Sequence, residues 1–122
     1  MKTILIIDDE PILNNAYCAL LKDSGYNTLG ALSAAEGIEL LKSQNPDAIL
    51  LDLNMPELDG IGFLKAVNIS KNYPNTKVII FTVSSEDKRI DKAFELGASK
   101  YILKALLSPN DLVTIVKKEI EN

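Results

Sequence analysis

The chain contains no histidine and only one cysteine, Cys18. The first absence excludes histidine–metal sites, serine–histidine and cysteine–histidine nucleophile pairs, and a phosphohistidine intermediate on this chain. The single cysteine excludes an internal disulfide. Any chemistry must therefore use carboxylates, hydroxyls and lysine, or a bound hard cation.

Long apolar runs and an excess of positive charge are also missing. No apolar run approaches the 18 residues or so that a membrane-spanning helix needs. The apolar run after Met1 is short for a signal peptide and leads into three acidic residues, so we expect a cytoplasmic protein. The net charge of −4 and the pI near 4.8 give no support to direct nucleic-acid binding. With 122 residues and no linker or low-complexity segment, we expect a single domain over 1–122.

Five short runs are typical of β-strands. Three of them are almost continuously apolar, as in parallel strands that are covered on both faces, and the second is more polar, as at a sheet edge. The runs are Thr3–Ile7, Tyr26–Gly30, Ala48–Leu51, Val78–Phe81 and Tyr101–Leu103.

Helical patterns lie between and after these runs. The first has an apolar stripe from Ile12 to Leu21 and ends near Ser24-Gly25. Ser33 and Glu36 form a capping box at the start of the second. The other three are expected to start near Asp59-Gly60, near Ser84-Ser85 and at Ser108-Pro109. The order is therefore (βα)₅, which predicts an α/β fold with an open, doubly wound, five-stranded parallel sheet.

Polar residues follow four of the five predicted strands. Asp8 and Asp9 follow the first, Asp52 the third, Thr82 the fourth and Lys104 the fifth. Because parallel strands end at one edge of the sheet, and open α/β sheets bind ligands there, these groups should share one site. At about 5 Å and an effective dielectric of about 20, each pair of carboxylates repels by roughly 3 kcal/mol, which a lysine or a cation must relieve.

This set of groups favours Mg²⁺ and phosphoryl chemistry. Mg²⁺ prefers carboxylate, carbonyl and water oxygens. We expect Asp9 and Asp52 as direct ligands, a backbone carbonyl at Asn54 as a third, and Asp8 as a partner of metal-bound water. A carboxylate can act as a nucleophile and form an acyl phosphate. Asp52 is the best candidate because it lies between the metal and Lys104, and Thr82 would then donate to a phosphoryl oxygen.

Taken singly, each feature has a simpler interpretation. Asp8-Asp9 and Asp52 could be turn or helix-capping residues, and Lys104 could be a solvated surface lysine. Thr82 alone carries almost no information. The hypothesis rests on their common placement at the ends of neighbouring strands.

Four motifs in order resemble the receiver domain of bacterial two-component response regulators: IIDDE (6–10), LLDLNMPELDG (50–60), IIFTV (79–83) and YILK (101–104). The resemblance covers the whole chain and implies a flavodoxin-like sheet with strand order 2-1-3-4-5. It implies that Asp8 and Asp9 bind Mg²⁺, that Asp52 is the phosphoacceptor, and that the Asn54 carbonyl is a metal ligand. In that family the donor is the phosphohistidine of a histidine kinase or a histidine phosphotransfer protein.

The resemblance also assigns a switch. Thr82 would move toward the phosphoryl group, Tyr101 would turn inward with it, and Lys104 would pair with Asp52 or its phosphate. Phosphorylation would then remodel the face formed by the fourth helix, fifth strand and fifth helix, which binds the downstream protein partner.

Two positions depart from the family pattern. Val83 stands where alanine or glycine is usual, so its branched side chain would crowd the phosphoryl site and slow the loss of phosphate. Ala105 stands where the family has a cis proline. Because a cis bond before a residue other than proline costs about 2.5–4 kcal/mol, we predict a trans Lys104–Ala105 peptide.

The leading hypothesis is a stand-alone phosphoacceptor with no output domain. A receiver module cut from a longer regulator or hybrid kinase stays open. A Mg²⁺-dependent hydrolase acting through an aspartyl phosphate is disfavoured, since such enzymes usually carry Asp-x-Asp and a lid. A phosphorylation-independent binding module is disfavoured by the complete acceptor set.

Overall fold

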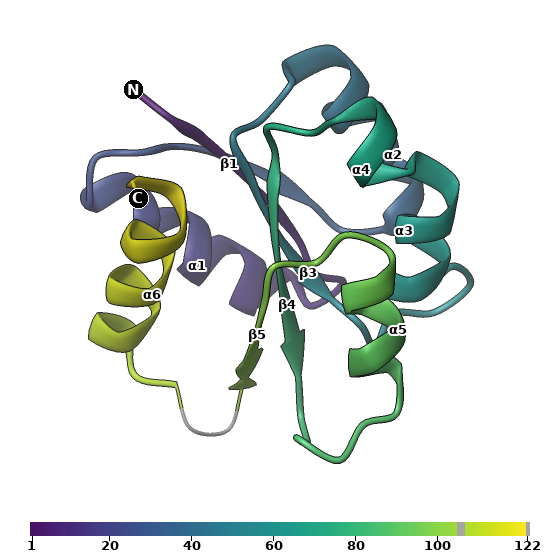
Figure 1. The fold of residues 1–122 in the computed structure, drawn as a ribbon. Helices are drawn as coiled ribbons and strands as arrows, with labels where there is room; N and C mark the ends of the chain where they lie inside the picture. Colours follow the sequence, from purple (N-terminus) through teal and green to yellow (C-terminus); the bar gives the residue numbers. More distant parts are fainter. Residues whose placement is uncertain (105–106, 122) are drawn as a thin grey trace.

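A computed structural model describes residues 1–104 and 107–121 of the chain (Figure 1). Its strands are β1 (Thr3–Ile7), β2 (Asn27–Ala31), β3 (Ala48–Asp52), β4 (Lys77–Thr82) and β5 (Lys100–Leu103). Its helices are α1 (Pro11–Asp23), α2 (Ala34–Gln44), α3 (Gly60–Val67), α4 (Ile69–Asn72), α5 (Arg89–Glu95) and α6 (Pro109–Glu121). No helix among the described residues is long and apolar enough to cross a membrane.

All five strands form one parallel sheet in the order β2-β1-β3-β4-β5, which confirms the predicted fold. The more polar β2 is an edge strand, as its composition indicated. Asp52 lies opposite Phe81 in the β3–β4 register, and Thr82 lies opposite Leu103 in the β4–β5 register. The register therefore brings the strand ends that carry the candidate residues to one edge of the sheet.

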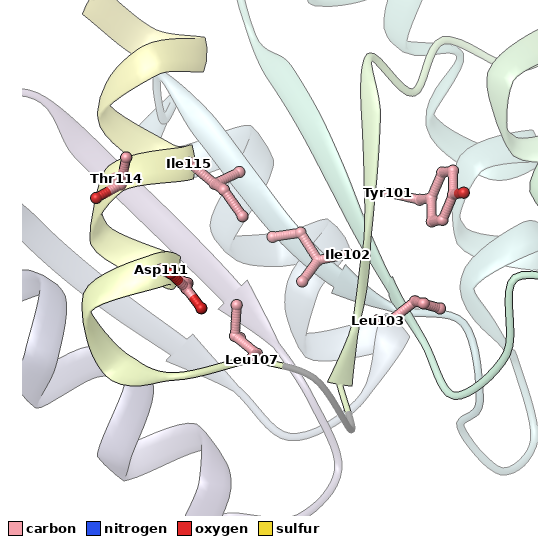
Figure 2. Close-up of a pocket in the computed structure, with 7 residues that line it drawn as sticks. All are labelled: Tyr101, Ile102, Leu103, Leu107, Asp111, Thr114 and Ile115. Atoms are coloured by element: carbon pink, nitrogen blue, oxygen red, sulfur yellow. The ribbon is translucent and has the colours of Figure 1, made fainter.

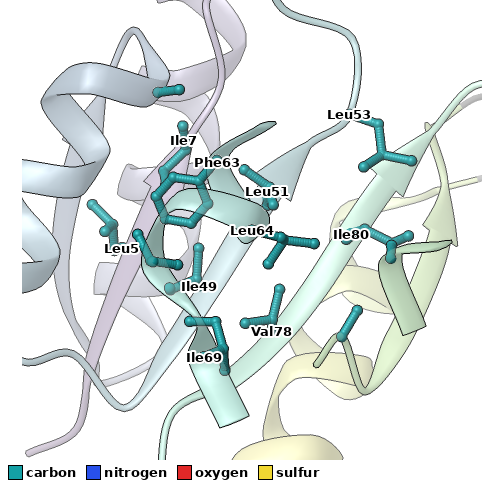
Figure 3. Close-up of a cluster of buried hydrophobic side chains, with 14 of the residues drawn as sticks. Leu5, Ile7, Ile49, Leu51, Leu53, Phe63, Leu64, Ile69, Val78 and Ile80 are labelled. Atoms are coloured by element: carbon teal, nitrogen blue, oxygen red, sulfur yellow. The ribbon is translucent and has the colours of Figure 1, made fainter. Parts of the chain in front are cut away.

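Two hydrophobic cores cover the two faces of the sheet, because alternate residues of each buried strand point to opposite sides. Leu5 and Ile7 face the core beneath α2, α3 and α5, where Phe63 is the largest side chain (Figure 3). Ile4 and Ile6 face the core beneath α1 and α6, which lie together on the other side of the sheet (Figure 1). This double coverage explains why the central strands are apolar at every position between their end residues.

The predicted helix starts are confirmed at three places. Ser33 caps α2, its side chain accepting from the Glu36 amide at 3.1 Å, and the Glu36 carboxylate accepts from the Leu32 amide at 2.8 Å. Asp59 caps α3 through the Gly62 amide at 2.9 Å. Pro109 is the first residue of α6.

The predicted α1 stripe was partly wrong. Ile12 is 84% exposed and Ala16 is exposed, whereas Asn14 is buried. The buried face of α1 runs through Asn14, Cys18 and Leu21, because the helix must place a polar group over the ends of β1 and β2. Apolar spacing alone cannot reveal such a position.

The predicted fourth helix also began too early. Residues 83–88 form a loop, and α5 starts at Arg89, whose amide donates to the Asp87 carboxylate at 2.9 Å. Phe94 of this helix is exposed. The short helix α4 was not predicted. The predicted trans Lys104–Ala105 peptide lies outside the described residues.

Candidate functional site

Three carboxylates meet at the carboxyl edge of the sheet. Asp8 and Asp9 come from the loop after β1, and Asp52 is the last residue of β3. One carboxylate oxygen from each lies within 4.8 Å of the others. Asp8 and Asp52 are buried, so their charges require partners.

Lys104 supplies that partner. Its Nζ donates to Asp8 Oδ2 and to Asp52 Oδ2, each at 3.1 Å, and lies 3.7 Å from the Glu10 carboxylate. It also stands over the Phe81 ring, 5.9 Å from the centroid. Its side chain is only 14% exposed. The positive charge of this lysine, at the end of an apolar strand, is thus compensated by two buried carboxylates and an aromatic face.

Burial dominates the protonation behaviour of the Asp52 carboxylate. Loss of solvation raises the pKa of Asp52, against the lowering effects of the Asn54 amide and Lys104. For Lys104, burial by itself disfavours the ammonium, but Asp52 and Asp8 outweigh it, so the pKa of Lys104 is raised. The lysine therefore stays charged at neutral pH.

The donor set fits a hard divalent cation. Mg²⁺ takes oxygen ligands, and three carboxylates within 4.8 Å of one another carry more negative charge than one lysine neutralises. Asn54 lies in the loop directly after Asp52, where its amide donates to Asp52 Oδ1 at 3.0 Å. The structure thus brings together Asp8, Asp9, Asp52, Asn54 and Lys104, as the sequence predicted.

Asn14 is a further residue at this edge that the sequence pattern did not predict. Its buried Nδ2 group lies within hydrogen-bonding distance of the carbonyls of Ile6 (3.3 Å), Asp8 (3.0 Å) and Ala31 (2.9 Å). A Cβ on Gly30 would lie 2.5 Å from Asn14 Oδ1, so glycine makes room for this amide. Asn14 therefore fixes the backbone that carries Asp8. The available signal was its spacing of seven residues from the buried Leu21.

The other three predicted residues do not contact the carboxylate cluster in this structure. The buried Thr82 hydroxyl is bonded to the following loop, 3.2 Å from the Ser84 carbonyl and 3.3 Å from Asp87 Oδ2. Val83 is 66% exposed.

Tyr101 is 38% exposed, and its ring packs edge-on against Phe94. Figure 2 shows Tyr101 and Ile102 on opposite sides of β5, with Ile102 toward α6. The aromatic ring thus points outward in this structure.

Comparisons with known proteins agree with this geometry. The sequence model of the response regulator receiver domain matches residues 4–117. The chemotaxis protein CheY of Thermotoga maritima is 30% identical over 118 residues, which cover 96% of this chain and 96% of that protein. A CheY-like receiver domain protein from Methanospirillum hungatei JF-1 superposes with a TM-score of 0.90 at 26% identity, covering 99% of this chain and 94% of that one.

Some relatives are longer. The nitrate/nitrite response regulator protein NarL of Escherichia coli K12 is 35% identical over 113 residues, which are 91% of this chain. The chain spans about half of that relative, 51% of its length. The family match, the sheet topology and the carboxylate cluster agree with one another. The chain belongs to the response regulator receiver domains, a family of signalling phosphoacceptors.

Proposed function

We propose that Asp52 is the residue that accepts the phosphoryl group, in a Mg²⁺-dependent reaction. The observation that supports this assignment is the position of its buried carboxylate, which lies within 4.8 Å of the Asp8 and Asp9 oxygens and accepts from the ammonium of Lys104 at 3.1 Å. The donor is the phosphohistidine of a histidine kinase or a histidine phosphotransfer protein, and the absence of histidine here fits an acceptor. With such partners we expect the chain to act in the cytoplasm.

The reaction needs positioning and charge neutralisation more than covalent help from the protein. An Asp52 oxygen attacks phosphorus and the P–N bond of the donor breaks. Its electron pair returns to the imidazole, which takes a proton from solvent. Lys104 leaves one of its two carboxylate partners to hold a phosphoryl oxygen. Water later cleaves the acyl phosphate, so the chain promotes its own phosphorylation and dephosphorylation but acts on no other substrate.

Asp8, Asp9 and Asp52 would hold Mg²⁺ together with the Asn54 carbonyl. When bound, the cation neutralises carboxylate charge and binds a phosphoryl oxygen. The chain itself contributes the acidic loop after β1. Asn14 holds the backbone of that loop by donating to the Asp8 carbonyl.

Thr82 and Tyr101 act as the switch, with Val83 beside them. After transfer, the Thr82 hydroxyl donates to a phosphoryl oxygen and Tyr101 turns inward. The downstream protein binds the α5–β5–α6 face, where a pocket opens between β5 and α6 beside residues such as Leu103 and Asp111 (Figure 2). The Tyr101 ring is part of the surface of this face. The partner's contacts with the face therefore change when the ring turns inward.

The test is intact-mass analysis with acetyl phosphate and MgCl₂. The wild type should gain one phosphate that hydroxylamine removes, as expected of an acyl phosphate. Asp52→Asn keeps the size of the side chain but should gain none. A hydroxylamine-labile phosphate mapped to another carboxylate would overturn the assignment to Asp52.

A further inference from the structure

The hydroxyl of Thr82 is engaged by the loop between β4 and α5. Its oxygen lies 3.3 Å from Asp87 Oδ2 and 3.2 Å from the Ser84 carbonyl, and the Ser84 amide donates back to it at 3.4 Å. A threonine hydroxyl has a single proton to donate. While that proton is directed to the loop, it is not available to a phosphoryl oxygen on Asp52.

Asp87 is itself held firmly by one residue. The Arg89 guanidinium reaches it through Nη2 at 2.8 Å and Nε at 3.1 Å, and the Arg89 amide donates to Oδ1 at 2.9 Å. These hydrogen bonds hold the pKa of Asp87 down at about 2. A forked guanidinium–carboxylate contact fixes direction as well as charge, so Asp87 presents its Oδ2 to Thr82 in one orientation.

The same arginine ties the loop to the acceptor strand. Its Nη1 donates to the carbonyl of Leu53, the residue after Asp52, at 3.0 Å and lies 3.6 Å from Asp59. The loop that follows Thr82 is thereby fastened to the loop that follows the acceptor. Thr82, Asp87, Arg89 and Leu53 form one connected set of contacts across the site.

We propose that Asp87, clamped by Arg89, is a positioning residue that holds the Thr82 hydroxyl away from the acceptor until phosphorylation. This inference rests on the proposed function, since it assumes that Thr82 donates to the phosphoryl group on Asp52. The hydroxyl must leave Asp87 before it can do so. The contact thus opposes the phosphorylated arrangement and lowers the rate at which it forms.

Removing Asp87 should speed phosphorylation. In Asp87→Ala the hydroxyl keeps only the neutral Ser84 carbonyl as a competing acceptor, which is a weaker partner than a carboxylate. The rate with acetyl phosphate should rise about three- to ten-fold, the range set by one charge-assisted hydrogen bond partly replaced by a neutral one. Asp87→Asn, which keeps an acceptor oxygen without the charge, should give a smaller rise.

The experiment measures phosphorylation rates by intact mass with acetyl phosphate and MgCl₂. The stability of each variant is first measured by urea unfolding, to verify that the variant is folded. Glu86→Ala is the matched control, because it removes the same charge from the neighbouring exposed residue and should leave the rate unchanged. Thr82→Ala and the double variant Thr82→Ala/Asp87→Ala should have equal rates, since without the hydroxyl Asp87 has nothing to hold.

The outcomes separate the two proposals. If the wild type gains no phosphate, or gains it away from Asp52, the proposed function fails. If the wild type is phosphorylated on Asp52 but Asp87→Ala is no faster, only the positioning role fails. An equal acceleration by Glu86→Ala would assign the effect to general charge. An equal acceleration by Asp87→Ala in the Thr82→Ala background would assign it to the released Arg89. Either result would also overturn the positioning role of Asp87.

Discussion

Replacing Lys104 with methionine tests the electrostatic balance of the site. The substitution keeps an apolar stem of similar length but removes the ammonium that bonds Asp8 and Asp52, each at 3.1 Å. Both carboxylates are nearly inaccessible to water, at 0% and 5% exposed. Removing one partner of a buried ion pair typically costs 3–5 kcal/mol. Because a carboxylate left without the lysine can take up a proton, the cost should fall at the low end of this range. We expect the free energy of unfolding to fall by about 3 kcal/mol at pH 7.

The dependence on pH follows from the sign of the Asp52 shift. Burial raises the pKa of Asp52, so the folded chain takes up this proton at a higher pH than the unfolded chain. Removing Lys104 should raise the pKa of Asp52 further. Lowering the pH from 7 to 5 should therefore reduce the difference in unfolding free energy between Lys104→Met and the wild type. Each pH unit over which only the folded state binds the proton contributes about 1.4 kcal/mol. Saturating MgCl₂ should narrow the gap as well.

The assay is urea unfolding followed by circular dichroism at pH 7 and pH 5, with and without MgCl₂. Lys100→Met is the matched control, since it removes the same group at the other end of β5 and should change stability by less than about 1 kcal/mol. Equal stability of Lys104→Met and wild type at pH 7 would contradict the charge-compensating role of Lys104, as would a difference in unfolding free energy that widens on acidification.

Three further predictions concern single residues. Asn14→Ala should lower the free energy of unfolding by about 2–3 kcal/mol, because it removes the buried amide that donates to the Asp8 and Ala31 carbonyls. The exposed neighbour Asn15→Ala should change the free energy of unfolding by less than about 0.5 kcal/mol in the same urea assay. Val83→Ala should lose phosphate faster than the wild type in a mass-spectrometric decay course; equal or slower decay would remove the crowding argument. Asp87→Asn should be less stable than wild type by roughly 1–2 kcal/mol at pH 5. Because Arg89 holds the folded pKa of Asp87 at about 2, that gap should close as the pH falls toward 2, and a gap independent of pH would count against the ion pair.

The sequence predicted most of the fold because the central strands are buried on both faces. A run such as Ala48–Leu51 has no polar face to confuse its assignment, and strand–helix alternation then limits the sheet to a parallel, doubly wound one. The start of α5 was missed because Ser84-Ser85 is a good cap in sequence, whereas the helix begins after Lys88, which makes no side-chain cap hydrogen bond. The contact between the Asp87 carboxylate and the Arg89 amide at this helix start is not visible in the sequence pattern.

The carboxylate cluster could be predicted for a related reason. Once the strands are parallel, Asp8, Asp52 and Lys104 must meet at one edge, whatever the details of packing. The spacing of Asn14 from Leu21 places both on one helix face but does not reveal its role, which depends on carbonyls at the ends of two strands and on the space left by Gly30. The orientation of Thr82 toward its own loop likewise depends on side-chain contacts that spacing does not encode.

The most direct test of the central claim is the mass of the protein after incubation with acetyl phosphate and MgCl₂, followed by mapping of the modified peptide. The account predicts one hydroxylamine-labile phosphate on Asp52, absent from Asp52→Asn and from wild type incubated with EDTA. A phosphate that persists in Asp52→Asn at wild-type stoichiometry would contradict it.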